Sequence, residues 1–235
     1  MLKLTKKIVV AVDGFSSCGK STFAKKIANE LGYIFIDTGA MYRSISLFAI
    51  QNQLVDETGN LNKSLIDRLP QIKIRFKRDE FGRVFTFLND VNVESDIRGV
   101  EVSQLVSEVS KIKEVRQYLV KMQQEMGRQK GIVMDGRDIG TIVFPKAEVK
   151  IYMSASSSVR AKRRYDELTE KGIKVSYEEI KRNIDDRDFN DLNRKISPLK
   201  KAKDAVVLDN SNMTVEEQMI WFNRLLIEKN LIAKN

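Results

Sequence analysis

The chain has 235 residues and a mass of 27.0 kDa, and its 41 Lys and Arg residues against 32 Asp and Glu residues give a net charge of +9. This size suits one sizeable hydrophobic core, and the positive charge favours anionic ligands. Histidine is absent and Cys18 is the single cysteine, which excludes Ser-His-Asp triads, histidine zinc sites and intramolecular disulfides. No apolar run reaches the roughly 18 residues that span a bilayer, and no secretory signal pattern opens the chain, so we expect a cytoplasmic protein with no membrane partner.

Short apolar runs alternate with longer amphipathic ones, which is typical of an α/β fold with a parallel sheet between two layers of helices. The apolar runs predict buried strands at residues 7–12, 33–36, 131–134, 149–153 and 205–208. The amphipathic runs predict helices at 20–31, 40–51, 102–109, 113–128, 157–171, 177–193 and 215–229. Gly32 has the position of a helix stop, and two pairs have the spacing of capping boxes, Ser176 with Glu179 and Thr214 with Glu217.

The alternation is interrupted between residue 60 and about residue 96. A short helical pattern is followed there by "QIKIRFKR" and "RVFTFLNDVNV", which alternate in polarity and carry turn signals at 79–82 and 89–90. The segment predicts a small antiparallel sheet with few apolar residues of its own. We therefore expect one domain over 1–235, with a core at 1–58 and 97–235 and an inserted subdomain at 59–96.

The first predicted strand leads into "DGFSSCGKST", which contains glycine, four residues, glycine, lysine and serine from Gly14 to Ser21. This is the pattern of a phosphate-binding loop, and it lies where the mechanism requires, between a strand and a helix. The glycines allow successive N–H groups to turn toward one anion, and the helix N-terminus adds partial positive charge. Lys20 would reach the β- and γ-phosphates of a nucleoside triphosphate, and Ser21 would face Mg²⁺. We interpret Cys18 as a small packed residue.

A GTPase switch would also need an Asn-Lys-x-Asp segment to recognise guanine. The nearest sequence, Asn62-Lys63-Ser64-Leu65, lacks the aspartate. The GTPase interpretation is therefore not favoured.

Two further segments place charged residues at the ends of predicted strands. "DTGAMYR" brings the Thr38 hydroxyl and the Arg43 guanidinium to the start of a helix, where an anion would be stabilised. "GIVMDGRDIGT" places Asp135, Arg137 and Asp138 directly after a buried strand, at the sheet edge where open α/β folds bind ligands. Taken alone, Arg43 could be a solvated helix residue and the second segment an ordinary turn.

Two predicted helices carry arginines on one face. Arg160, Arg163 and Arg164 have the spacing i, i+3, i+4, and a second set, Arg187, Asp191 and Arg194, has the spacing i, i+4, i+7. Either set could be a solvated ladder of ion pairs. Mobile arginines that close over transferring phosphates are the alternative that a phosphate-binding loop favours.

In their order and spacing, "DGFSSCGKST", "DTGAMYR", "VSEVSKIKEVR", "MDGRDIGT" and "RDFNDLNRKISPL" resemble the bacterial cytidylate kinases over essentially the whole chain. The resemblance implies a P-loop nucleoside monophosphate kinase fold with a five-stranded parallel core, an enlarged monophosphate-binding insertion and a lid at residues 154–193. It also implies Mg²⁺-dependent transfer of the γ-phosphoryl group of ATP to CMP or dCMP. A monomer that binds no nucleic acid would be expected.

The resemblance further implies roles for individual residues. The ATP phosphates would be held by Gly14, Phe15, Ser16, Ser17, Cys18, Gly19, Lys20, Ser21 and Thr22, with Ser21 toward the metal. The acceptor phosphate would be clamped by Arg43, Arg137 and Arg187, with Asp191 and Arg194 on the sugar and phosphate side. The CMP pocket would be lined by Thr38, Ser107, Arg116 and Asp138, and the lid arginines Arg160 and Arg164 would meet the phosphates on closure.

The chain departs from the family pattern at three of these positions. Phe15 stands where proline is common, and Cys18 where a smaller residue is common, which leaves the phosphate contacts of the loop possible. Thr38 replaces a frequent serine and keeps the hydroxyl.

Base choice follows from hydrogen bonding. Cytosine offers an N4–H donor that Asp138 could accept, beside N3 and O2 acceptors to which Arg116 could donate. Uracil has an oxygen in place of N4, which a buried carboxylate would repel. We therefore expect CMP and dCMP to be preferred over UMP by about 10⁴.

Two other functions remain open. A P-loop kinase for a nucleoside or another small molecule would share the first loop but would not need the arginine clamps. A nucleic-acid-binding module would explain the basic composition, but its positive charge should form a continuous stripe with stacking aromatic residues.

Overall fold

The computed structural model describes residues 3–56 and 61–233. The chain divides into two compact units, which we call unit 1 (Met1–Phe35 and Gln129–Asn235) and unit 2 (Ile36–Arg128). The predicted boundary between residues 58 and 59 lies outside the described residues. The limits 59–96 for the inserted subdomain and 154–193 for the lid stay predictions.

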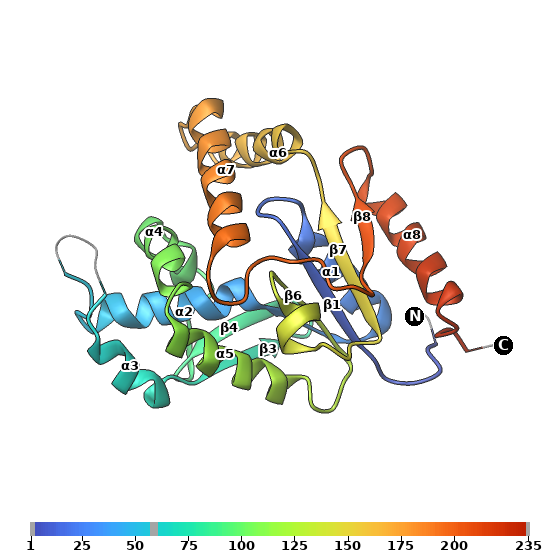
Figure 1. The fold of residues 1–235 in the computed structure, drawn as a ribbon, viewed down its shortest axis with the longest axis horizontal. Helices are drawn as coiled ribbons and strands as arrows, with labels where there is room; N and C mark the ends of the chain where they lie inside the picture. Colours follow the sequence, from blue (N-terminus) through green and yellow to red (C-terminus); the bar gives the residue numbers. More distant parts are fainter. Residues whose placement is uncertain (1–2, 57–60, 234–235) are drawn as a thin grey trace. The chain divides into compact units, whose positions relative to one another are not determined.

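Unit 1 is built on a five-stranded sheet with the strand order β2-β6-β1-β7-β8 (Figure 1). The strands are β1 (Val9–Gly14), β2 (Ile34–Asp37), β6 (Ile132–Gly136), β7 (Val149–Ser154) and β8 (Val206–Asp209), and β2 leads from unit 1 into unit 2. β1 pairs in parallel with both β6 and β7, and β7 pairs in parallel with β8. The predicted five-stranded α/β fold is confirmed, and each strand lies within two residues of its predicted limits.

The burial of each strand follows its position in this sheet. All six residues of the central strand β1 and all five of β6 are buried, as their continuous apolar pattern predicts for strands covered on both faces. β8 lies at the sheet edge, and there Leu208 is buried while Val207 is 48% exposed. Sequence alone did not separate central from edge strands, because both read as short apolar runs.

The helices of unit 1 are α1 (Lys20–Leu31), α6 (Ser157–Glu170), α7 (Tyr177–Asn193) and α8 (Val215–Glu228), and a π-helical turn, η3, covers Ile139–Val143. In the core, the rings of Phe23 on α1 and Phe222 on α8 meet edge to face, with centroids 6.2 Å apart. These buried aromatic faces explain why both segments are amphipathic.

The predicted helix-end signals are confirmed. Gly32 ends α1 in the left-handed conformation, with φ of 67°, which a glycine adopts without steric cost. Both capping boxes are present, Ser176 with Glu179 at the start of α7 and Thr214 with Glu217 at the start of α8. In each box the hydroxyl accepts from the backbone N–H of the glutamate, so these helix starts need only local sequence.

Unit 2 contains a three-stranded antiparallel sheet and helices. The sheet runs β3 (Ile74–Arg78), β4 (Val84–Leu88) and β5 (Val91–Asn92), which confirms the predicted antiparallel segment. Asn89 and Asp90 join β4 to β5 with positive φ values of 46° and 68°, as a two-residue hairpin requires. The helical segments are α2 (Thr38–Gln51), α3 (Ser64–Arg68), η1 (Leu69–Gln71), η2 (Asp96–Arg98), α4 (Val100–Val109) and α5 (Lys113–Met126). Within residues 3–56 and 61–233, none of the helices of either unit has the length and apolarity to cross a membrane.

Candidate active site

The loop between β1 and α1 has the strand–loop–helix position predicted for a phosphate-binding loop. Gly14 ends β1 with φ of 153°, and a Cβ there would lie 2.1 Å from the carbonyl oxygen of Met153 on β7. Gly19 caps α1 with φ of 88°. Glycine is required at both positions, because a side chain would clash at the first and be strained at the second. The N-terminus of α1 therefore opens onto the loop, with its N–H groups and partial positive charge available to an anion.

Lys20 begins α1 and is only 6% exposed. Its Nζ donates to the carbonyl oxygen of Phe15 and lies 3.7 Å from the Sγ of Cys18. Burial lowers the pKa of Lys20, and the nearby charge of Arg137 lowers it further. Cys18 is fully buried, as the interpretation of a small packed residue predicts. The folded chain thus holds a desolvated ammonium group inside the loop, where phosphate oxygens would stabilise its charged form.

Ser21, the second residue of α1, donates from Oγ to Oδ2 of Asp135 at 2.6 Å. Asp135 is buried near the end of β6, the strand next to β1. A hydroxyl and a carboxylate beside a phosphate-binding loop are the hard oxygen ligands that Mg²⁺ prefers, since this ion usually binds one or two protein groups together with phosphates and water. The residues present therefore fit a magnesium ion. Our residue assignments omitted Asp135, although its position directly after a buried strand pointed to it.

Asp13 is a site residue that sequence reasoning missed. Its carboxylate, buried near the end of β1, accepts from the backbone N–H groups of Ile139 (2.8 Å) and Gly140 (2.7 Å) in η3. Burial raises the pKa of Asp13 to about 6, although these two hydrogen bonds oppose the shift. Asp13 thus ties the strand before the phosphate-binding loop to the turn that follows Arg137 and Asp138. An aspartate at the end of an apolar strand gave little signal, because its partners lie 126 and 127 residues away.

The raised pKa of Asp13 predicts a pH-dependent contribution to stability. The carboxyl group of Asp13 has a pKa near 3.8 in the unfolded state and of about 6 in the folded state, so as the pH rises the unfolded state loses this proton first. Stability from this group is therefore full below about pH 3.8 and is lost as the pH rises through about 6. Asp13→Asn cannot titrate, so the free energy of unfolding of the wild type minus that of the variant should fall by about 2 kcal/mol from pH 4.5 to 7.5. Urea unfolding at both pH values measures this difference, and a constant difference would contradict the shifted pKa.

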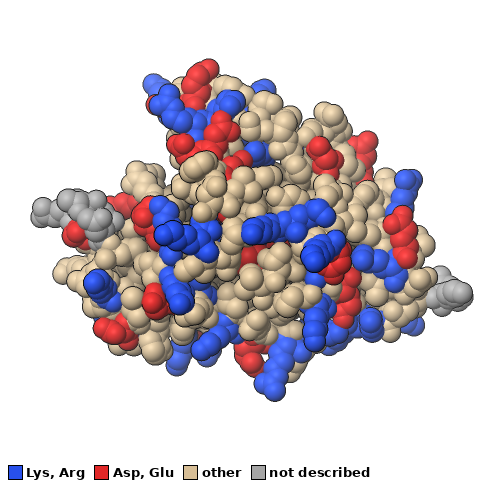
Figure 2. All heavy atoms as spheres, viewed as in Figure 1, with Lys and Arg blue, Asp and Glu red and all other residues tan. Residues whose placement is uncertain are grey.

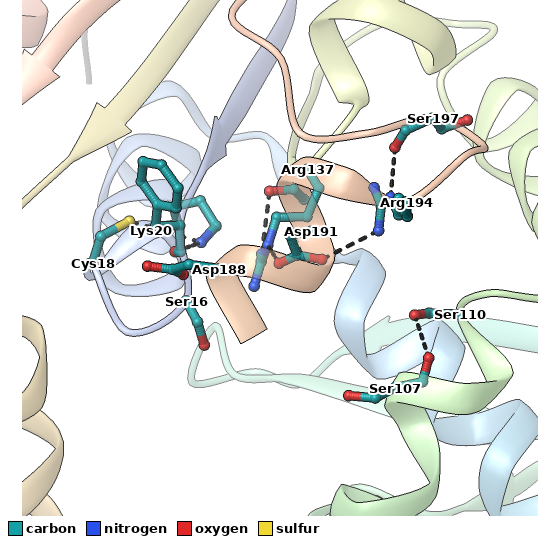
Figure 3. Close-up of polar contacts among 12 residues, drawn as sticks. Ser16, Cys18, Lys20, Ser107, Ser110, Arg137, Asp188, Asp191, Arg194 and Ser197 are labelled. Atoms are coloured by element: carbon teal, nitrogen blue, oxygen red, sulfur yellow. Dashed lines mark hydrogen bonds and ion pairs between the residues drawn. The ribbon is translucent and has the colours of Figure 1, made fainter. Parts of the chain in front are cut away.

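Arg137 and Arg194 lie on either side of Asp191, which is on α7 (Figure 3). The Nε of Arg137 donates to Oδ2 of Asp191 at 2.6 Å, and Nη1 of Arg194 donates to Oδ1 at 3.3 Å. Arg194 also donates to the carbonyl oxygen of Ser197 at 2.6 Å. Although burial opposes both shifts, this pairing raises the pKa of Arg137 and lowers that of Asp191. The carboxylate thus holds two guanidinium groups in fixed orientations.

The other predicted residues of β6, η3 and α7 lie near this array. The charge of Arg187 contributes to the lowered pKa of Asp191, which places the two side chains close together on α7. Asp138 immediately precedes η3 and is 6% exposed, and its charge contributes to the raised pKa of Asp13. The charges of Arg137 and Asp191 also act on the pKa of Lys20, Arg137 lowering it and Asp191 raising it.

The arginines of α6 differ in their surroundings. Arg160 is 4% exposed, and its Nη2 forms an ion pair with Oδ2 of Asp188 on α7 at 2.6 Å. Arg163 donates to the side-chain and main-chain oxygens of Asn210. Arg164 pairs with Glu167 on its own helix, and its side chain is 42% exposed. The shared face that the spacing predicts thus contains one buried, one partly buried and one solvated arginine.

Unit 2 holds the remaining predicted residues. Nη2 of Arg43 donates to Oδ2 of Asp37 at 2.8 Å, and Oδ1 of Asp37 accepts from the N–H of Ala40, so this carboxylate caps α2 and orients Arg43. Arg43 keeps the pKa of Asp37 below its usual value, although burial opposes that shift. Thr38 is the first residue of α2 and is buried. The sequence analysis predicts Arg43 and Thr38 as site residues but does not predict the contacts of Asp37 with Arg43 and Ala40.

Two helices of unit 2 carry the other members of the predicted nucleoside pocket. Arg116 on α5 is 2% exposed, donates from Nη1 to the carbonyl oxygen of Ser110 at 3.1 Å and stacks on the ring of Tyr42, 5.4 Å from its centroid. The carbonyl oxygen of Ser107 on α4 accepts from the hydroxyl of Ser110 at 2.8 Å (Figure 3). A buried arginine held by a carbonyl and an aromatic ring is pre-oriented, which suits recognition of a planar ligand.

The site combines a glycine-bounded loop between β1 and α1, a buried lysine at the start of α1 and a serine–aspartate pair beside the loop. Carboxylates hold a set of arginines in fixed orientations. This combination defines a P-loop phosphotransferase. The family model for cytidylate kinase matches residues 10–221. The chain belongs to the cytidylate kinase family.

Individual relatives agree with this assignment. The chain is 54% identical to the cytidylate kinase of Phocaeicola vulgatus over 92% of this chain and 95% of the relative. It is 55% identical to the cytidylate kinase of Parabacteroides distasonis, with the same coverage of both chains. Among solved structures, a shikimate kinase from Bacteroides thetaiotaomicron aligns with 94% of this chain and 99% of its own, at 12% identity and a TM-score of 0.46. The likeness to that structure is too slight to carry any argument.

Proposed function

We propose that this enzyme transfers the γ-phosphoryl group of ATP to CMP or dCMP, giving ADP and CDP or dCDP. The observation that carries the proposal is the pairing of Arg137 and Arg194 with Asp191, together with a phosphate-binding loop whose lysine has its pKa affected by the charges of Arg137 and Asp191. A kinase that acts on a phosphorylated acceptor needs cationic groups for the acceptor phosphate as well as for the donor. The family to which the chain belongs supports cytidine monophosphates as the acceptor class.

The residues of the loop, Gly14 to Thr22, would bind the donor phosphates. Lys20 would stabilise the negative charge that develops during transfer. The Ser21 hydroxyl and Asp135 would hold Mg²⁺ together with those phosphates. When bound, this ion would neutralise part of the phosphate charge. These groups position and stabilise the donor, which is the main requirement of phosphoryl transfer.

As the family resemblance implies, the acceptor phosphate of CMP would be clamped by Arg43, Arg137 and Arg187. One of its oxygens would attack the γ-phosphorus in line with the leaving oxygen of ADP. The attacking oxygen is already anionic, so no side-chain base and no covalent enzyme intermediate are needed. The nucleoside would be bound by Thr38, Ser107, Arg116 and Asp138, with Asp191 and Arg194 on the sugar and phosphate side. Arg164 is the solvated arginine of α6 that could approach the phosphates when the lid closes.

A panel of acceptors tests this proposal. With MgATP as donor, an ADP-coupled assay should give rapid turnover with CMP and dCMP, and kcat/KM values lower by at least about 10³ with AMP, GMP and UMP. A matched reaction without acceptor controls for simple ATP hydrolysis. Rapid turnover of a nucleoside or a sugar, with none of CMP, would instead support the second candidate, a different P-loop small-molecule kinase.

The distribution of charge argues against nucleic acid as the ligand. The face in Figure 2 shows acidic side chains interspersed among the basic ones. Many lysines and arginines also form ion pairs with neighbouring carboxylates, for example Lys162 with Asp166 and Lys181 with Asp185. We also propose that the enzyme acts as a monomer, as the family resemblance implies.

A further inference from the structure

Three carbonyl groups of the phosphate-binding loop accept hydrogen bonds from side chains. The carbonyl oxygen of Phe15 accepts from Nζ of Lys20. That of Ser16 accepts from Nη1 of Arg160 at 3.1 Å, and that of Cys18 accepts from Nδ2 of Asn210 at 2.9 Å. Two of the three donors therefore lie outside the loop motif, on α6 and after β8.

These bonds constrain the N–H groups of the loop. In a planar trans peptide the C=O of one residue and the N–H of the next point in opposite directions. A donor that fixes the carbonyl of Ser16 therefore turns the N–H of Ser17 away from Arg160. In the same way, Asn210 turns the N–H of Gly19 away from itself. N–H groups are the part of such a loop that binds phosphate oxygens. Arg160 and Asn210 therefore orient these groups through the carbonyl side of the same peptides.

Arg160 is itself held on several sides. Its Nε donates to the carbonyl oxygen of Ala155 at 2.9 Å, and its guanidinium stacks on the ring of Phe15, 5.1 Å from the centroid. The ion pair with Asp188 adds a partner from α7. All three nitrogens of the Arg160 guanidinium have a partner, and the residue is 4% exposed, so it is a rigid support for the loop.

Asn210 is held as firmly, although it carries no charge. It is 1% exposed, and its Oδ1 and its backbone carbonyl both accept from Arg163, at 3.3 and 2.8 Å. Its Nδ2 lies 3.4 Å from Oε1 of Gln218 on α8, besides its bond to Cys18. The amide therefore cannot turn over without losing these bonds.

We propose that Arg160 and Asn210 are positioning residues that preset the N–H groups of the phosphate-binding loop for an oligophosphate. In this role Arg160 acts through the Ser16 peptide and needs no direct contact with the phosphates. The inference rests on the proposed function only in taking the donor phosphates as the ligand of the loop.

Binding of inorganic tripolyphosphate and of ADP, measured by calorimetry, tests the inference. Asn210→Leu keeps the approximate shape and removes the donor without adding charge, and Arg160→Lys keeps the charge but cannot reach Ser16, Ala155 and Asp188 together. Both variants should bind tripolyphosphate and ADP at least about tenfold more weakly than the wild type, as expected for a lost buried hydrogen bond. CMP affinity should stay within about twofold, so that KM rises for ATP and not for CMP.

Lys162→Gln on the exposed side of α6 is the matched control and should bind all ligands like the wild type. If Asn210→Leu does not fold, by circular dichroism, Asn210→Ser replaces it. Wild-type tripolyphosphate affinity in the Asn210 variant would overturn the inference, as would an Arg160→Lys defect confined to kcat. Because the binding measurement needs no acceptor, it decides the positioning role even if the acceptor is not CMP.

Discussion

Lys20→Met should lower kcat by at least about 10³-fold while the protein stays folded. The ammonium group sits within the phosphate-binding loop, bound to the Phe15 carbonyl, and methionine keeps its apolar stem without the charge. Transition-state charge on the transferring phosphoryl group would then lack its nearest cation. Stopped or coupled assays at saturating ATP and CMP measure the loss.

The thermal stability of Lys20→Met should not fall with its turnover. Burial lowers the pKa of Lys20, which means that the folded state disfavours its charged form. Removing the charge should therefore leave the melting temperature at pH 7 unchanged or raise it. Lys162→Met, at an exposed site of α6, is the matched control and should keep wild-type turnover. Turnover of Lys20→Met within tenfold of the wild type would contradict the role given to Lys20.

Asp138→Asn should collapse the discrimination between CMP and UMP. The wild type should prefer CMP by about 10⁴ in kcat/KM, because the carboxylate of Asp138 would accept from cytosine N4 and repel uracil O4. An asparagine can present either its oxygen or its NH₂ group, so the preference should fall to about tenfold or less. Paired assays with CMP and UMP at fixed MgATP measure the ratio for both proteins.

The Asp138 prediction separates base recognition from folding. Asp138 is buried, so the variant's unfolding transition in urea must be compared with that of the wild type. A folded variant that keeps a 10⁴ preference would show that another group reads the base. If the phosphate clamp is independent of Asp138, the Asp138→Asn variant should keep the wild-type kcat with saturating dCMP.

Much of the fold could be predicted because its signals are local. The strands appeared as apolar runs, Gly32 and the two capping boxes marked helix ends, and the turn at Asn89–Asp90 marked a hairpin. Each of these features depends on residues within a few positions of one another. Their agreement with the structure reflects backbone preferences that need no tertiary contact.

The supporting residues of the site could not be predicted in this way. Asp13, Asp188 and Asn210 have no local pattern, since a carboxylate or an amide near the end of a strand or within a helix has many uses. Their partners are distant in sequence: Arg160 and Ser16 are 144 positions apart, and Asn210 and Cys18 are 192 positions apart. Spacing on α6 put Arg160 and Arg164 on one face but did not distinguish the buried arginine from the solvated one.

The sequence by itself determined the phosphate-binding loop, the order of strands and helices and the residue types available for chemistry, because glycine geometry, periodicity and composition are properties of short segments. The tertiary structure alone decided which charged groups are buried together. Only folding brings α6, α7 and the end of β8 against the loop, and there each carboxylate depends on its partner: Asp191 on Arg137, Asp188 on Arg160 and Asp135 on the hydroxyl of Ser21.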